Sequence, residues 1–205
     1  MVEAPEYISN VRFNFRNGPI RLYEHGMTDE DFYNFCFKNP ELRIERSPNG
    51  QIIIMPPTTS ETGRRNFEIA LEIGLWNRQF KLGHVFDSST GFKLPNGAER
   101  SPDTSWILKE RWDALLSEDK QKFAPIVPDF VLELRSQDQG LNELREKMAE
   151  YMDCGCRLGW LIDPQNRRTY VYSANGDIQT IKFEDILSGY DLMPGLNVRL
   201  ADILD

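Results

Sequence analysis

The stretch Val127-Pro-Asp-Phe-Val-Leu-Glu-Leu-Arg-Ser136 contains a nearly continuous apolar run with a glutamate inside it. A run of this kind over residues 129–135 is typical of a strand at the centre of a sheet, covered on both faces. Side chains alternate across a strand, so Glu133 and Arg135 are expected on the same face. Because burying a carboxylate without a partner costs several kcal/mol, Glu133 needs a cation, a metal ion or a proton.

The segments around this strand alternate between helical and extended patterns. Apolar residues recur at helical spacing in residues 63–82, which should form the longest helix, and again in residues 141–153. Short helices are expected at residues 28–39 and within residues 109–122. Extended patterns predict further strands at residues 42–46, 51–55, 84–87, 91–94, 103–108, 158–162, 169–172 and 178–183. This order predicts an α/β sandwich with a central mixed sheet flanked by helices.

Two Pro-Asn-Gly sequences predict turns between neighbouring strands. The first, residues 48–50, predicts a β-hairpin over residues 42–55. The second, residues 95–97, lies in a region that we expect to form an antiparallel meander of three strands over residues 84–108. The whole 205-residue chain has the length of a single domain. We expect the first helix and the hairpin, about residues 1–58, to be an N-terminal extension of that domain.

Composition and charge exclude several classes of protein. Hydrophobic residues make up 40% of the chain and charged residues 27%, which excludes wholesale disorder. No apolar run reaches the roughly 18 residues of a membrane helix, and Met1–Pro5 lacks the features of a signal peptide. The net charge of −8 has the wrong sign for coating nucleic acid without specificity. We therefore expect a soluble cytoplasmic protein that contacts nucleic acid, if at all, through a local basic patch or metal ions.

The three cysteines predict reduced thiols. Cys154 and Cys156 are separated by one residue, a poor geometry for a mutual disulfide, and Cys36 leaves the set odd. Reduced thiols are in line with an intracellular location. A structural zinc site is disfavoured because such sites usually need four Cys or His ligands, and the chain has two histidines.

Two carboxylates, Asp103 and Glu133, lie in segments that should be strands. Two interpretations are open on spacing alone. In the first, Arg135 neutralises Glu133 and Asp103 caps a turn after Pro102, so that both acids serve the fold. In the second, the two carboxylates converge from adjacent strands on Mg²⁺ or Mn²⁺, which bind through one or two carboxylates and keep waters for substrate phosphates. Such an ion polarises a phosphodiester and lowers the pKa of an attacking water.

Four motifs in order carry a family resemblance: Arg100-Ser-Pro-Asp103, Val127–Ser136, Lys147–Tyr151 and Gly159-Trp-Leu-Ile-Asp-Pro164. Together they resemble the bacterial family of restriction-endonuclease-like proteins, a branch of the PD-(D/E)XK nuclease superfamily. The likeness extends from about Met55 to Leu192-Met-Pro-Gly-Leu196. It implies a restriction-endonuclease-like fold that hydrolyses DNA with Mg²⁺ or Mn²⁺ held by Asp103 and Glu133. It also implies a homodimer; neither an organic cofactor nor a membrane is expected as a partner.

The sequence departs from the superfamily pattern at one position. The third residue of Glu133-Leu-Arg135 is Arg rather than Lys, and a guanidinium does not deprotonate in a protein, so Arg135 can stabilise charge but cannot be a base. The resemblance suggests that Lys147, four residues before Tyr151, replaces the missing lysine. The alternatives are a solvated Lys147 and, for the whole chain, a weak or inactive nuclease-like domain that binds nucleic acid or a protein partner.

The predicted helix over residues 63–82 carries further candidates near its start. Arg64 and Arg65 are the best local basic pair for contact with DNA phosphates, and solvated surface arginines are the alternative. A third acid often comes from the first long helix in this superfamily, and Glu61, Glu68 and Glu72 are the candidates here. Their spacing also fits a solvated, charged helix face.

Overall fold

The computed structural model describes residues 14–15, 18–23 and 26–204. Contacts between residues divide the chain into two compact units. The first comprises residues 1–57, 91–101 and 117–126, and the second comprises residues 58–90, 102–116 and 127–205. That the chain is a single domain with an N-terminal extension stays a prediction. Every helix of the described residues falls short of the length and apolar character needed to cross a membrane.

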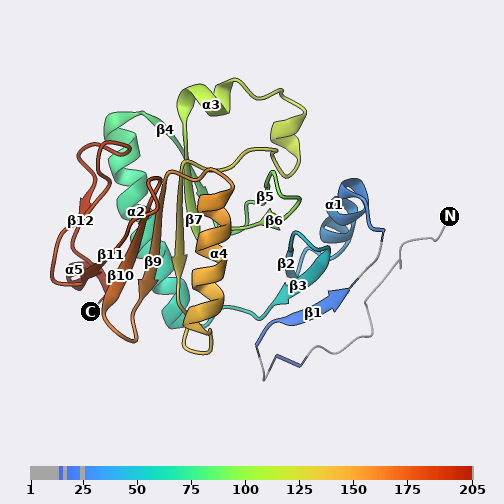
Figure 1. Cartoon of the computed structure of the whole chain (residues 1–205), viewed down its shortest axis with the longest axis horizontal. Helices are drawn as coiled ribbons and strands as arrows, with labels where there is room; N and C mark the ends of the chain where they lie inside the picture. The colour runs from blue at the N-terminus through green and yellow to red at the C-terminus, as the bar shows by residue number, and fades with distance from the viewer. Residues whose placement is uncertain (1–13, 16–17, 24–25, 205) are drawn as a thin grey trace. The chain divides into compact units, whose positions relative to one another are not determined.

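The second unit is built on a six-stranded mixed sheet with the order β11-β10-β9-β8-β7-β4 (Figure 1). Strands β8 and β9 run parallel, and the other neighbours run antiparallel. The strands are β4 (Gly83–Asp87), β7 (Thr104–Leu108), β8 (Phe130–Leu134), β9 (Leu158–Asp163), β10 (Arg168–Ser173) and β11 (Ile178–Lys182). The prediction that the apolar run at residues 129–135 forms a central strand is confirmed, because β8 lies between β7 and β9.

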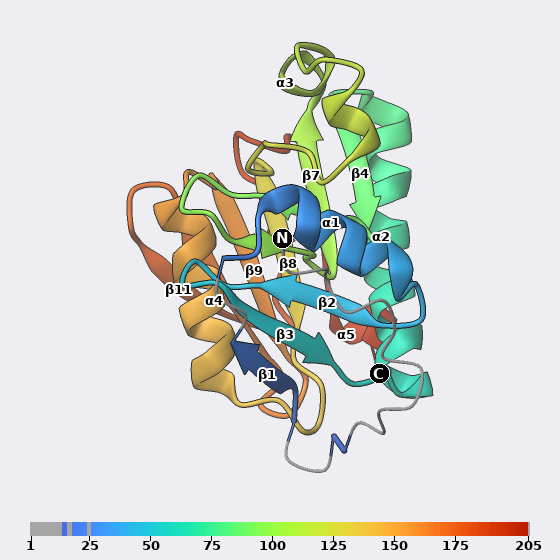
Figure 2. The ribbon, with the colours of Figure 1, turned by 90° about the vertical axis from the view of Figure 1, so that its right-hand side faces the viewer.

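Two long helices cover opposite faces of this sheet, α2 (Ser60–Phe80) and α4 (Leu141–Asp153) (Figure 2). Helix α2 starts three residues before the predicted position because the Thr59 side chain caps it by accepting a hydrogen bond from the Thr62 N–H. It ends at Lys81, which has a left-handed backbone. The smaller elements of the unit are α3 (Lys109–Asp113), β12 (Leu187–Ser188), β13 (Asn197–Val198) and α5 (Ala201–Leu204).

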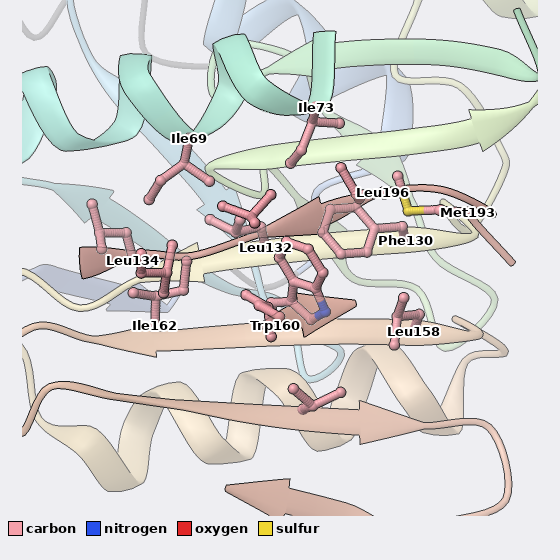
Figure 3. Close-up of a cluster of buried hydrophobic side chains, with 14 of the residues drawn as sticks. Ile69, Ile73, Phe130, Leu132, Leu134, Leu158, Trp160, Ile162, Met193 and Leu196 are labelled. Atoms are coloured by element: carbon pink, nitrogen blue, oxygen red, sulfur yellow. The ribbon is translucent and has the colours of Figure 1, made fainter. Parts of the chain in front are cut away.

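The main apolar core lies between α2 and the sheet (Figure 3). Its fully buried side chains include Ile69 and Ile73 from α2 and Trp160 from β9. From the central strand β8, the residues at even positions (Phe130, Leu132 and Leu134) point into this core. Because side chains alternate, Val131 and Glu133 point to the other face, which α4 covers. Packing of the core therefore fixes the side of the sheet on which the glutamate lies.

The first unit contains a five-stranded sheet with the order β1-β3-β2-β6-β5. The predicted hairpin over residues 42–55 is confirmed as β2 and β3. Helix α1 lies across this sheet and packs Phe32 against three isoleucines (Figure 2). The elements are β1 (Ile20–Tyr23), α1 (Asp29–Lys38), β2 (Arg43–Arg46), β3 (Gln51–Met55), β5 (Phe92–Lys93), β6 (Glu99–Arg100) and the 3₁₀ helix η1 (Asp119–Gln121).

The predicted three-strand meander over residues 84–108 is wrong. Strand β4 pairs directly with β7, and β5 pairs with β6 in the sheet of the first unit. The cause is the tight turn at residues 95–97, closed by a hydrogen bond from the Leu94 N–H to the Ala98 carbonyl. Because of this turn, β5 pairs with the segment that directly follows it, β6. Strand β7 comes later in the chain and pairs with β4 instead.

None of the three cysteines, all of which lie in the described part of the chain, forms a disulfide. Cys156 is buried, and Cys36 and Cys154 are partly buried. Burial raises the pKa of both the Cys36 and the Cys156 thiols to about 12. These two side chains therefore stay protonated at neutral pH and behave as apolar groups rather than as nucleophiles or metal ligands.

Candidate active site

Strands β7 and β8 bring the two predicted carboxylates together. Thr104 of β7 lies opposite Leu132 of β8 in the antiparallel register. Asp103 directly precedes Thr104, and Glu133 directly follows Leu132, so this pair brings the two acids close together. A direct contact supports this arrangement, because Asp103 Oδ2 accepts a hydrogen bond of 2.9 Å from the Leu134 N–H. Asp103 thus lies directly before β7, and its carboxylate reaches the backbone of β8 next to Glu133.

Helix α4 supplies the groups that surround Glu133. Lys147 Nζ lies 2.9 Å from Glu133 Oε1, and the Tyr151 hydroxyl donates a hydrogen bond of 3.1 Å to the same oxygen. Lys147 and Tyr151 are four residues apart, so they lie one turn apart on one face of the helix. The side chains of Lys147 and Glu133 are 12% and 3% exposed. Lys147 is therefore a largely buried partner of the glutamate and not a solvated lysine.

Arg135 has a different partner from the one that the first interpretation expected. Its Nη1 lies 3.2 Å from both carboxylate oxygens of Asp163, and its Nε donates to the Gln139 carbonyl at 3.0 Å. The parallel register explains this, because Leu134 lies opposite Ile162 and the next residues along are Arg135 and Asp163. The sequence motif contained Asp163 but offered no signal of this pairing, since the register of β8 and β9 is a tertiary property.

The donor set of the cluster fits a hard divalent cation. Two carboxylates are within the number with which Mg²⁺ and Mn²⁺ bind to proteins. Asp103, Glu133 and Lys147 carry a formal charge of −1 together, so an additional cation would offset repulsion between two nearly buried carboxylates. Over residues 14–15, 18–23 and 26–204, no three or more His, Cys, Asp or Glu side chains gather as a ligand group. Asp103 and Glu133 are thus the two carboxylates that this cluster brings together.

Helix α2 contributes none of the contacts to Asp103 and Glu133 described above. Arg64 Nη2 and Arg65 Nε each lie 2.9 Å from Glu61 Oε1 on the helix surface. The hydrogen bond from Arg64 lowers the pKa of the Glu61 carboxyl, which is thus held in its charged form. Such exposed pairs contribute little to stability and exchange readily with other ions, so both arginines keep their capacity to contact phosphate. Glu68 and Glu72 are partly exposed on the same helix.

The first motif also contains Arg100, which belongs to the first unit. Its Nη1 lies 3.2 Å from Glu45 Oε2, and both side chains are buried. Glu45 also accepts a hydrogen bond of 3.1 Å from the Ser101 N–H. This buried pair joins β2 to the segment that follows β6, so Arg100 has a structural partner within its own unit.

The mixed sheet and α4 thus bring together an aspartate directly before β7, a glutamate of β8 and a lysine of the next helix. The model of the Uma2 family, described as "Putative restriction endonuclease", matches residues 29–201. The chain belongs to this family.

The fold is shared with a solved structure described as a "putative nuclease belonging to DUF820 from Anabaena variabilis ATCC 29413". The two chains superpose with a TM-score of 0.68 at 18% sequence identity, over 80% of this chain and 90% of that chain. This likeness confirms the predicted α/β fold with a mixed central sheet. A comparison with curated proteins gives no match.

Replacing Arg135 with alanine tests whether this residue serves the fold or the site. Asp163 is fully buried, and losing its guanidinium partner should lower the free energy of unfolding by about 3 kcal/mol. Affinity for Mn²⁺ should be unchanged. Urea unfolding and calorimetry measure the two quantities. The matched control is Arg199→Ala, which breaks an exposed pair with Asp202 and should cost under about 1 kcal/mol. Loss of Mn²⁺ affinity in Arg135→Ala would place Arg135 in the site.

Proposed function

We propose that this chain is a metal-dependent endonuclease that hydrolyses DNA phosphodiester bonds at Asp103 and Glu133. The observation that carries the proposal is that Asp103 bonds to the Leu134 N–H, next to Glu133 on β8, while Lys147 lies 2.9 Å from Glu133. Membership of a family described as a restriction endonuclease supports the class of reaction. Lys147 supplies the ammonium that the sequence lacks at position 135, and this favours hydrolysis over a binding-only role.

Asp103 and Glu133 would hold Mg²⁺ or Mn²⁺. When bound, such an ion polarises the scissile phosphodiester and lowers the pKa of a water molecule. The protein orients both ligands through its own hydrogen bonds: the Leu134 N–H holds Asp103, and Lys147 and Tyr151 hold Glu133. Ligands that are already oriented lose less conformational freedom when they bind a cation, so these donors favour metal binding.

Lys147 acts as the catalytic cation in this proposal. Its ammonium is nearly buried, where a charge acts more strongly than it does in water. A positioned cation stabilises the negative charge that develops on phosphoryl oxygens in the transition state. Lys147 also offsets the charge of Glu133 before substrate arrives.

The remaining parts of the proposal concern partners and location. Arg64 and Arg65 contact the DNA backbone, since the net charge of −8 leaves binding to local basic groups and metal ions. The protein works as a homodimer, so that two sites address two strands. It is cytoplasmic, where free thiols persist.

Removing either carboxylate charge should abolish metal binding and cleavage. Asp103→Asn and Glu133→Gln keep shape and hydrogen-bonding capacity, and each should weaken Mn²⁺ binding by at least about 100-fold while the fold persists. Because the two residues act through one ion, the double variant should be hardly worse than either single variant. Calorimetry with Mn²⁺, plasmid cleavage in Mg²⁺ and thermal melts measure these effects.

The matched control for the carboxylate variants is Asp177→Asn, at an exposed residue of the turn between β10 and β11, which should behave as wild type. Unchanged Mn²⁺ affinity in both single variants would contradict the proposal. Wild-type protein that binds Mn²⁺ and DNA but never cuts the DNA would favour the binding-only alternative.

Lys147→Met keeps an unbranched side chain of similar size but removes its charge. Single-turnover cleavage at saturating Mg²⁺ should fall by about 10², the loss typical of one removed charge-stabilising group. Lys147→Arg should restore part of the rate if the lysine acts as a cation, because arginine retains the charge. Lys182→Met, at an exposed residue of β11, is the control. Cleavage at the wild-type rate by Lys147→Met would contradict the assignment of Lys147 and would leave Arg135 as the candidate for the catalytic cation.

The homodimer is tested by light scattering coupled to gel filtration. The expected mass is twice the 23.8 kDa of one chain. The measurement should be made with and without Mn²⁺ and a short DNA duplex, because either could promote association. A mass of one chain under all four conditions would show that the protein is a monomer.

A further inference from the structure

Tyr151 is the largest buried side chain of α4, yet it carries a polar group into the interior of the protein. The residue is fully buried. A buried hydroxyl without a hydrogen bond costs free energy, and a phenylalanine would fill the same volume without this requirement. The Tyr151 hydroxyl meets the requirement at Glu133 Oε1, to which it donates at 3.1 Å. The hydroxyl thus has a defined partner, and that partner is a candidate metal ligand.

Tyr151 contacts both members of the buried ion pair. Its hydroxyl bonds to Glu133, and the centroid of its ring lies 5.9 Å from Lys147 Nζ. This distance is within the range at which a cation is attracted by the face of an aromatic ring. Leu144 and Met148, the other buried residues of α4, fix the helix on the sheet, so the ring of Tyr151 has little freedom to move.

Two donors from one helix meet a single oxygen of Glu133. Lys147 Nζ and the Tyr151 hydroxyl both reach Oε1, and this defines the rotation of the carboxylate group. Asp103 is held in a comparable way, through one oxygen and the Leu134 N–H. Each of the two carboxylates therefore has an oxygen fixed by a donor of the protein.

We propose that Tyr151 is a positioning residue for the metal ligand Glu133. Its hydroxyl holds the carboxylate in the orientation that binds a divalent cation, and its ring keeps Lys147 beside the same oxygen. This inference rests on the proposed function of the site. It differs from a packing role because it assigns the effect on metal affinity to the hydroxyl, which Tyr151→Phe removes while the ring stays. Donors to a ligating carboxylate typically contribute about tenfold or more to metal affinity.

The test is Tyr151→Phe, which removes the hydroxyl and keeps the ring. Calorimetry should show that Mn²⁺ binds about tenfold more weakly than to the wild type. The Mg²⁺ concentration for half-maximal plasmid cleavage should rise by a similar factor, and the rate at saturating Mg²⁺ should fall less, because Lys147 is still present. Near-UV circular dichroism checks that the variant keeps its native packing.

Tyr172→Phe is the matched control, because Tyr172 is a buried tyrosine of the same sheet, on strand β10. Its Mn²⁺ affinity should equal that of the wild type. Wild-type affinity in Tyr151→Phe, together with lost affinity in Glu133→Gln, would overturn the role of Tyr151 and leave the proposed function standing. Equal weakening in Tyr151→Phe and Tyr172→Phe would also overturn it, since the loss would then come from general loosening. Unchanged affinity in Glu133→Gln would overturn the proposed function itself.

Discussion

The burial of the Glu133 carboxylate on the central strand of the sheet constrains the rest of the second unit. With 3% of its side chain exposed, Glu133 needs partners within the protein, and Lys147 and Tyr151 of α4 provide them at a single oxygen. Both donors come from the same face of α4 and must reach the same oxygen. These contacts therefore fix the rotation of α4 about its own axis and its position along the sheet. The apolar residues Leu144 and Met148 then complete the packing of that helix.

The pairing of β8 with its two neighbouring strands determines which charged side chains lie next to each other. The antiparallel register with β7 places Asp103 next to Glu133, and the parallel register with β9 directs Arg135 to Asp163. Lys147 thus pairs with Glu133, while Arg135 neutralises a separate buried acid, Asp163, at the end of β9. This division leaves Glu133 with an ammonium as its cation. A lysine ammonium is a compact charge that can shift its position as an ion or substrate enters, unlike a guanidinium held by two bonds.

Much of this arrangement could be predicted from the sequence, because it depends on local patterns. The continuous apolar run predicts β8 as the central strand, and helical spacing predicts α2 and α4. Glu133 lies within a strand as expected, whereas Asp103 lies one residue before β7 rather than inside it. What the sequence could not provide depended on register and on competition between partners. The segment that forms β5 pairs with β6 rather than β4, Arg135 pairs with Asp163, and Tyr151 bonds to Glu133. Each of these pairings depends on which residues the strand registers and the packing of α4 place next to each other in the folded protein.

The central claim is that Asp103 and Glu133 hold one divalent cation while α4 supports Glu133 from the side. A crystal grown in Mn²⁺ and measured at a wavelength where manganese scatters anomalously tests this claim most directly. The account predicts one anomalous peak within bonding distance of both carboxylates, with Lys147 and Tyr151 still in contact with Glu133 Oε1. A structure without a peak at Asp103 and Glu133, in which the Lys147 ammonium bridges the two carboxylates instead, would contradict the account.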